Sequence, residues 1–305
     1  MAKKLKIGTR ESKLAIWQAE FIQNALLANG IESELVFIKT HGEMNVSTPL
    51  YEMGIQGIFT KTLDIALLNK EIDIAVHSLK DVPTQLAKGL VIAATPKRGN
   101  PYDVLVYKEA LPQPFLPYLV ATSSLRRSAQ WLHRYPEHAT TPLRGNINTR
   151  LTKMLENPTW DGAIFAAAGI ERIQLDVPNE WLLNWMIPAP AQGALAVIAR
   201  ETDEYTKTIC SQINDEATQI ATAFERKFLR KLMGGCSMPI GGLAKIDNNT
   251  LYFKGCVLTT DGKQMSEVVI NGSIDKFDEL LDEAINTLFD NGGAAIIDSF
   301  KTKNA

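Results

Sequence analysis

The first forty residues alternate between strand and helix patterns, and this order constrains the fold more than any other feature. Residues 4–9 alternate in polarity, residues 14–26 repeat apolar side chains at helical spacing, and residues 34–40 form a second strand-like run. Ser12 can cap the intervening helix, and Gly30 can end it. A strand, a helix and a strand in this order predict parallel pairing, so we expect an α/β fold.

A polar segment follows the next strand of the predicted sheet. Residues 58–68 have helical spacing, and the short apolar strand at 72–76 leads into the polar run at 77–83. Open α/β sheets bind ligands just beyond the carboxyl ends of their strands, so this run is a candidate site. Residues 40–56 show no sustained period, and a connection of this length is typical of a functional lid.

Two segments rich in proline and glycine divide the chain. Residues 96–103 predict a crossing into a second α/β set, which occupies residues 104–173. Residues 188–193 predict a return crossing, after which residues 195–200 form a strand that can rejoin the first set. We therefore expect two α/β lobes joined by two crossings, similar in architecture to periplasmic solute-binding proteins. The first lobe would comprise residues 1–97 and 194–215, and the second residues 98–193.

The last third of the chain has a different pattern. A helix is predicted at 217–233, stopped by Gly234-Gly235, and two strand-like runs at 250–258 and 265–271 flank the turn sequence Asp261-Gly262. A final helix at 277–289 is expected to end at Gly292-Gly293. We expect a small C-terminal α+β domain over residues 216–305.

The overall charge is almost balanced, but the arginines are concentrated. The chain has 32 basic and 34 acidic side chains, which excludes a strongly basic nucleic-acid binder. Six of its arginines lie between residues 122 and 172, where seven basic and four acidic side chains give a local charge of 7 − 4 = +3. Arginine suits bidentate recognition of anions, so the cluster favours a small polyanionic ligand over the alternative of solvated surface charge.

The sequence also indicates where the chain works. No run approaches the roughly 20 apolar residues of a membrane span, and the first residues lack the apolar stretch of a signal peptide. Three cysteines without a C-x-x-C pair predict neither a disulfide framework nor a structural zinc site. We expect a reduced, cytoplasmic setting without membrane or nucleic-acid partners.

Two residues could carry chemistry on local grounds. Asp81 follows Lys80 just after a strand, where a carboxylate can bind a cation or exchange protons, although a simple turn aspartate is the alternative. His77 and Asp81 have no third ligand nearby, so no metal site is expected. Cys236 lies among four glycines and could be a nucleophile, a covalent attachment point or a structural thiol, whereas Cys210 and Cys256 are expected to pack as small hydrophobes.

Turns that contain glycine could add backbone donors to an anion site. Gln192-Gly193 and the segment Leu143-Arg144-Gly145-Asn146 lie near predicted strand or helix starts. Neither matches a known phosphate-binding glycine motif, so a nucleotide cofactor is not indicated.

Six motifs in order give the chain a specific resemblance. They are Ile7-Gly-Thr-Arg10-Glu-Ser12-Lys-Leu-Ala, Asp73-Ile-Ala-Val-His-Ser78-Leu-Lys80-Asp81-Val-Pro-Thr, Thr122-Ser-Ser-Leu-Arg126-Arg127-Ser-Ala-Gln, Leu143-Arg144-Gly-Asn-Ile-Asn-Thr-Arg150-Leu, Ala167-Ala-Gly-Ile-Glu-Arg172-Ile and Gly235-Cys236-Ser-Met-Pro-Ile-Gly241. Together they resemble the hydroxymethylbilane synthase family, also called porphobilinogen deaminase, over nearly the whole chain.

The resemblance implies a transferase that condenses four porphobilinogen molecules, with loss of ammonia, into linear hydroxymethylbilane. It implies a dipyrromethane cofactor held by a thioether to Cys236, with Asp81 as the catalytic proton-handling residue. The cofactor contacts would be Lys80, Ser78, Thr122, Ser124, Arg126, Arg127, Arg144 and Gly145, with Ser123 in a neighbouring position. The substrate contacts would be Arg10, Ser12, Arg150, Arg172 and Gln192. The family also implies a monomer.

The charge pattern agrees with this ligand on independent grounds. Each porphobilinogen carries an acetate and a propionate, so every added unit brings about two negative charges that arginine side chains can bind. The alternative that the residues leave open is a two-lobed carboxylate-binding protein or sensor without turnover.

The sequence departs from the family pattern in the predicted lid. Gln56 replaces a usual lysine, Glu43 a usual aspartate, and Thr62 a usual acidic residue; an acidic position is also missing within residues 196–200. Loss of a positive charge at Gln56 predicts altered loop dynamics or weaker affinity, not a different reaction.

Overall fold

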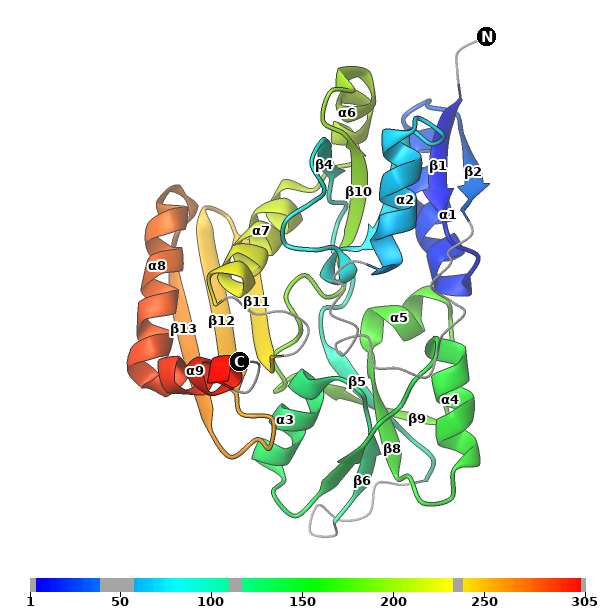
Figure 1. Ribbon diagram of the computed structural model, residues 1–305. Helices are drawn as coiled ribbons and strands as arrows, with labels where there is room; N and C mark the ends of the chain where they lie inside the picture. The colour runs from blue at the N-terminus through cyan, green and yellow to red at the C-terminus, as the bar shows by residue number, and fades with distance from the viewer. Residues whose placement is uncertain (1–3, 39–57, 110–116, 233–237, 303–305) are drawn as a thin grey trace. The chain divides into compact units, whose positions relative to one another are not determined.

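The structure is a computed structural model that describes residues 4–38, 58–109, 117–232 and 238–302. The chain divides into two compact units (Figure 1): the first comprises residues 1–99 and 193–220, and the second residues 100–192 and 221–305. The domain limits expected from the sequence remain a prediction.

Unit 1 is built on a mixed five-stranded sheet. Its strands are β1 (Leu5–Thr9), β2 (Ser33–Phe37), β3 (Ile74–Ser78), β4 (Leu90–Ala94) and β10 (Leu195–Arg200), in the order β2-β1-β3-β10-β4. β1 pairs in parallel with β2 and β3, which confirms the β-α-β unit at the start of the chain. β10 pairs antiparallel with both β3 and β4, so the return strand does rejoin the first sheet, as predicted.

Three helices pack against this sheet. They are α1 (Lys13–Ala28), α2 (Ile58–Leu68) and α6 (Glu204–Ser211). Ser12 begins α1 as expected, because its hydroxyl accepts a hydrogen bond from the Ala15 backbone N–H at 3.3 Å. Gly30 follows the end of α1 with φ +76°, a left-handed conformation that favours glycine.

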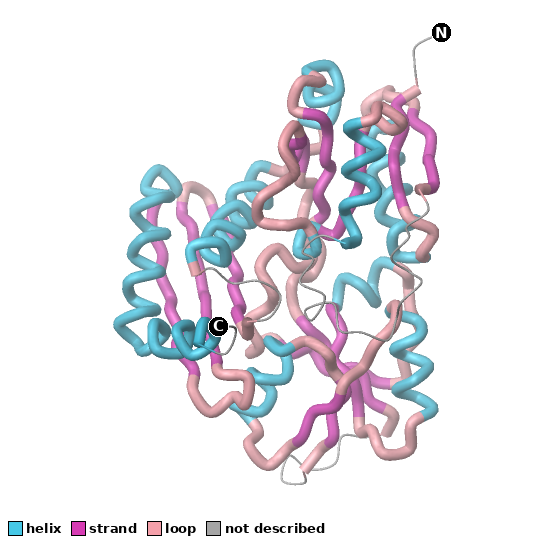
Figure 2. Tube along the Cα trace, in the orientation of Figure 1, coloured by secondary structure: helices cyan, strands magenta, loops and turns pink. Residues whose placement is uncertain are grey.

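Unit 2 contains a second five-stranded sheet. Its strands are β5 (Asp103–Tyr107), β6 (Leu119–Ala121), β7 (Ala139–Thr141), β8 (Gly162–Ala166) and β9 (Asn179–Leu183), in the order β7-β6-β8-β5-β9. β6 is parallel to β7 and β8, whereas β5 is antiparallel to β8 and β9. The helices of this part are α3 (Leu125–Arg134), α4 (Ile147–Glu156) and α5 (Ala167–Arg172); Figure 2 shows them beside the strands of the sheet.

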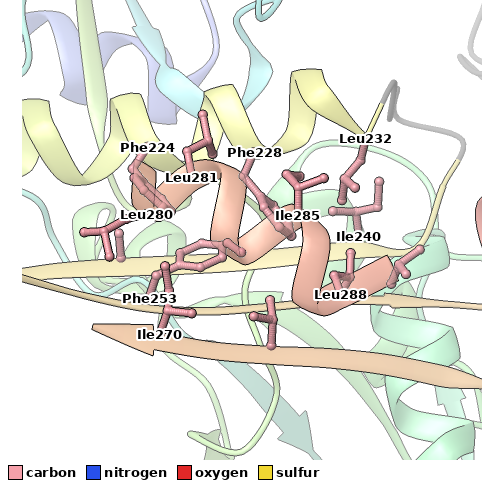
Figure 3. Packing of buried hydrophobic residues seen from close by; sticks show 14 of the residues in the cluster. Phe224, Phe228, Leu232, Ile240, Phe253, Ile270, Leu280, Leu281, Ile285 and Leu288 are labelled. Carbon is pink, nitrogen blue, oxygen red and sulfur yellow. The ribbon is translucent and has the colours of Figure 1, made fainter. Parts of the chain in front are cut away.

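The C-terminal part of the chain is an antiparallel sheet covered by helices. The sheet has the order β11 (Ile240–Asp247), β12 (Thr250–Leu258), β13 (Met265–Ser273), and the helices are α7 (Glu216–Lys231), α8 (Phe277–Leu288) and α9 (Ala294–Thr302). Figure 3 shows apolar side chains of the helices and the sheet packed together. The centroid of the Phe253 ring on β12 lies 4.9 Å from that of Phe224 and 4.8 Å from that of Phe228. The expected α/β fold with a C-terminal α+β part is therefore confirmed.

The hairpin predicted at Asp261-Gly262 joins β12 to β13 and contacts α3. Gly262 has φ +72°, and a Cβ added there would lie 2.5 Å from the Ala129 carbonyl oxygen. The Gly262 carbonyl oxygen and His133 Nδ1 are 2.8 Å apart. Only glycine permits this approach. The tip of the hairpin therefore lies directly against α3, which has Arg126 and Arg127 in its first turn.

Several elements differ from the sequence-based expectation. Strands β4, β7, β9 and β11 were not anticipated, and β2 ends at Phe37, whereas its predicted end at Thr40 lies outside the described residues. The last predicted helix does end near Gly292, whose φ is +94°, but the chain then continues into α9. Among the described residues, no helix combines the length and apolar character that a membrane crossing needs.

Candidate active site

The polar segment of unit 1 lies at the carboxyl end of β3. A single 3₁₀ turn, η2 (Leu79–Asp81), follows the strand directly. Leu79 is buried, and its backbone N–H donates to the Ala194 carbonyl oxygen at 3.0 Å. This anchor fixes the turn, on which Lys80 is half-buried and Asp81 is exposed. An exposed carboxylate on a fixed backbone can meet a ligand without a rearrangement of the fold.

The structure brings Arg10 and Ser12 to the same edge of the sheet. β1 is parallel to β3, with Ile7 paired to Ile74, so the two strands end side by side. Arg10 and Ser12 follow β1, and Arg10 is close enough to act electrostatically on His77 of β3. Ser78 is held by Gln18, whose Nε2 donates to the Ser78 hydroxyl at 2.8 Å. Sequence reasoning predicted these residues separately, and the parallel pairing unites them.

His77, considered above only as a metal ligand, is buried beneath this segment. Its side chain is 6% exposed, and its Nε2 has no hydrogen-bond partner in the described part of the chain. Burial, assisted by the positive charge of Arg10, lowers the pKa of His77 to about 3. A neutral imidazole therefore underlies the turn that carries Asp81.

Acid is expected to destabilise the protein through His77. The unfolded chain binds a proton at this residue below pH 6.5, but the folded chain binds it only near pH 3. The contribution is thus complete above about pH 6.5 and decreases by about 1.4 kcal/mol per pH unit as the pH falls toward 3. Urea unfolding at pH 7.5 and pH 5 should show that His77→Gln loses about 2 kcal/mol less free energy of unfolding than the wild type. Equal losses in the two chains would contradict a buried neutral His77.

In unit 2, two predicted arginines are buried around one carboxylate. Arg126 and Arg127 are each 6% exposed, and Asp103, the first residue of β5, is fully buried. Arg126 Nη1 lies 2.8 Å from Asp103 Oδ2, and Arg127 Nη2 lies 2.8 Å from Oδ1. For these two arginines the alternative of solvated surface charge is wrong. We call the three residues the Asp103 triad.

The electrostatics of the Asp103 triad are those of an anion site. Burial alone would raise the pKa of Asp103, but the two guanidinium groups hold it well below its ordinary range. Burial lowers the pKa of Arg127; Asp103 opposes this shift, while the charges of Arg126 and Arg150 add to it. One buried carboxylate thus faces two guanidinium groups, and the net positive charge of these three residues favours binding of a further carboxylate.

The residues that lead into α3 form a compact hydroxyl cluster. Ser124 is the N-cap of the helix and accepts from the Arg127 backbone N–H. Thr122 is buried, and its hydroxyl accepts from the Ser124 backbone N–H at 3.2 Å. The Ser123 hydroxyl bonds both backbone groups of Leu143, at 2.8 and 2.9 Å. This last contact holds the loop that continues into Arg144.

The loop before α4 uses a glycine to place Arg144 and Arg150. Gly145 has φ +121°, a value that L side chains rarely adopt. Its carbonyl oxygen accepts from Arg150 Nε at 2.7 Å, and the Arg144 carbonyl oxygen accepts from Lys153 Nζ at 3.2 Å. The structure therefore connects Arg150 to Gly145 by a hydrogen bond and to Arg127 through charge.

Two further predicted residues also belong to unit 2. Arg172 ends α5, and burial lowers its pKa to about 10 against the opposing charge of Glu171. Gln192 is buried, and its Nε2 donates to the Pro101 carbonyl oxygen at 2.8 Å and to Asp103 Oδ1 at 3.0 Å. Gln192 thus forms a hydrogen bond with Asp103 of the triad. Asp103 itself was not predicted from the sequence.

The structure describes two of the three cysteines. Cys210 and Cys256 are buried, as expected, and burial raises the pKa of each thiol to about 12. Both are therefore inert protonated thiols at neutral pH. Cys236 lies outside the described residues, as do Glu43 and Gln56 of the predicted lid, whereas Thr62 is half-buried on α2.

The sequence matches two family models that together span most of the chain. One, described as "Porphobilinogen deaminase, dipyromethane cofactor binding domain", matches residues 5–208, and the other, "Porphobilinogen deaminase, C-terminal domain", matches residues 219–289.

Curated relatives with the same name cover almost the full length. Porphobilinogen deaminase of Brevibacillus brevis is 43% identical over 276 residues, which is 88% of this chain and 89% of the relative. The enzyme of Desulforamulus reducens is 38% identical over 307 residues, 99% of both chains. Among solved structures, a nutrient binding protein from Burkholderia cenocepacia bound to methionine is 12% identical with a TM-score of 0.40, covering 76% of this chain and 98% of that one.

Proposed function

The chain belongs to the porphobilinogen deaminase family, enzymes that condense porphobilinogen into hydroxymethylbilane, and from this premise we propose which of its residues carry the reaction. The observation that carries the proposal is the Asp103 triad, in which one buried carboxylate balances only part of the charge of two buried guanidinium groups. Such an excess suits a substrate that brings two carboxylates with each added unit.

The residues of unit 2 fit the dipyrromethane cofactor that the family uses. Each of its two rings carries carboxylate side chains, and the described arginines supply planar, charged donors for them. The cofactor contacts proposed here are Ser78, Lys80, Thr122, Ser124, Arg126, Arg127, Arg144 and Gly145, with Cys236 forming the thioether. When bound, the dipyrromethane supplies the pyrrole carbon to which the first substrate unit is joined.

Asp81 is proposed as the catalytic residue. Positive charge develops on the pyrrole ring of porphobilinogen as ammonia leaves, and a fixed carboxylate stabilises that charge and can accept a proton from the ring. Asp81 suits this role because it is exposed while its turn is anchored through buried Leu79.

The remaining predicted residues are proposed to bind the substrate carboxylates. They are Arg10, Ser12, Arg150, Arg172 and Gln192. Ser12 also caps α1: its oxygen accepts from the Ala15 N–H, and its O–H can donate to a ligand carboxylate. Burial disfavours the charged form of the Arg172 guanidinium, and a bound anion would stabilise it.

We further propose that the enzyme acts as a cytoplasmic monomer without nucleic-acid or membrane partners. The nearly balanced charge of 32 basic and 34 acidic side chains supports the absence of nucleic-acid partners, since nucleic-acid binding requires a basic surplus.

One experiment tests the proposed cofactor chemistry. The intact mass of the purified full chain should exceed the sequence mass by the dipyrromethane, and Ehrlich's reagent should give the corresponding colour. Incubation with porphobilinogen should then release ammonia and consume the substrate. An unmodified mass together with intact porphobilinogen would contradict the proposal and favour a carboxylate-binding protein without turnover.

A further inference from the structure

Asp103 contacts three of the residues assigned above to ligand binding. Its Oδ1 accepts from Arg127 Nε at 2.9 Å and from Gln192 Nε2 at 3.0 Å, and its Oδ2 pairs with Arg126 Nη1 at 2.8 Å. It is the first residue of β5 and is 0% exposed, so it reaches no ligand itself. Its influence on a ligand must pass through the side chains that it holds.

The backbone of unit 2 completes the orientation of both arginines. Arg126 Nη1 donates to the Ile187 carbonyl oxygen at 2.8 Å, and Arg127 Nη1 donates to the Ile164 carbonyl oxygen at 2.9 Å. Gln130 fixes the position of the Ile187 backbone, because its side-chain amide accepts from the Ile187 N–H at 2.8 Å and donates to the Ile187 carbonyl oxygen at 2.9 Å. Each guanidinium therefore has a backbone acceptor on one side and Asp103 on another.

The Asp103 carboxylate also allows the positive charges of Arg126 and Arg127 to lie next to each other in the protein interior. Without it, two buried guanidinium groups would repel each other and lack their shared acceptor, and burial of unpaired charge is strongly unfavourable. With it, the three residues of the triad keep a net charge of +1. Asp103 thus offsets part of the positive charge of the two arginines while their net charge still favours an anion.

We propose that Asp103 is a positioning residue, which holds Arg126 and Arg127 in the arrangement that receives the carboxylates of the dipyrromethane and keeps Gln192 beside them. This inference rests on the proposed function of those two arginines. It predicts that Asp103 governs how fast the chain takes up its cofactor, and not only how stable the chain is.

The test measures cofactor loading in full-length apo protein. Wild type, Asp103→Asn and Asp103→Glu are incubated with porphobilinogen below their unfolding temperatures, and the fraction with added mass is followed by intact-mass spectrometry. Asp103→Asn removes the charge, and loading is expected to be at least about tenfold slower. Asp103→Glu keeps the charge but displaces the guanidinium groups by about one methylene, and a displacement of that size also predicts at least about tenfold slower loading.

A matched control separates positioning from stability. Asp73 is a buried carboxylate of unit 1 that pairs with Arg200 Nη2 at 3.3 Å, and it is assigned to no ligand. Asp73→Asn should lower the unfolding temperature yet load at the wild-type rate. Loading of both Asp103 variants at the wild-type rate would overturn the inference, and if Asp103→Asn does not fold, the result with Asp103→Glu decides alone.

A further variant, Arg126→Leu, tests the proposed cofactor-binding role of the arginines separately from the role of Asp103. Arg126→Leu should load slowly if the arginines bind the cofactor. Normal loading of Arg126→Leu would contradict the proposed site, whereas slow loading of Arg126→Leu with normal loading of the Asp103 variants would contradict only the role of Asp103.

Discussion

The Asp81→Ala variant is expected to consume porphobilinogen about a thousandfold more slowly than the wild type. The substitution removes the carboxylate proposed to stabilise the positive pyrrole ring and to move its proton, and alanine offers no replacement. Because Asp81 is exposed and its turn is anchored through Leu79, the fold should not change. Steady-state ammonia release, measured on protein whose intact mass shows the cofactor, is the appropriate assay.

Glu201 provides the control for this variant. It is also an exposed turn carboxylate of unit 1, and it is assigned to no ligand. Glu201→Ala should keep the wild-type rate, and both variants should unfold at the wild-type temperature. If Asp81→Ala kept more than about a tenth of the wild-type rate, Asp81 would not be the proton-handling group.

The Cys236→Ser variant is expected to carry no added mass and to have no measurable turnover. A serine hydroxyl does not form the thioether, so the chain would have no primer to extend. The other two cysteines cannot substitute, because Cys210 and Cys256 are buried thiols whose pKa is raised to about 12. Intact-mass spectrometry of the purified variant reads the result directly.

Cys210→Ala is the matched control, since it removes a thiol that the proposal leaves unmodified. It should keep the cofactor mass and the wild-type rate of ammonia release. Added mass on Cys236→Ser, or its absence from Cys210→Ala, would show that the attachment site has been assigned to the wrong residue.

The parts of the fold that follow from local patterns were predictable from the sequence. The β-α-β unit has alternating and helical periods within forty residues, and the hairpin has Asp261-Gly262 at its turn. β11 was missed because its Gly241-Gly242 pair resembles a loop. In the structure, a Cβ at Gly241 would lie 2.9 Å from Cys256 Sγ, so the glycine serves close packing inside the sheet.

The site shows a different limit of sequence reasoning. The arginine concentration predicted an anion-binding region, and the structure confirms that Arg126 and Arg127 are not ordinary surface residues. Asp103 was missed because it precedes Arg126 by more than twenty residues and lies outside the arginine-rich stretch at 122–172. The burial of Asp103 and its ion pairs with Arg126 and Arg127, which only the fold brings together, show that this acid belongs to the interior of unit 2.

The central place of β10 has a consequence for the synthesis of the chain. β3 and β4 are translated before residue 95, but the strand that separates them in the sheet starts only at Leu195. At 5–20 residues per second, the ribosome needs roughly 5 to 20 s to deliver it. During that interval the edges of β3 and β4 that will pair with β10 are unpaired, and open strand edges are prone to pair with other chains. The first unit to be translated is therefore among the last to be completed, and chaperone protection would matter most while residues 100–192 emerge.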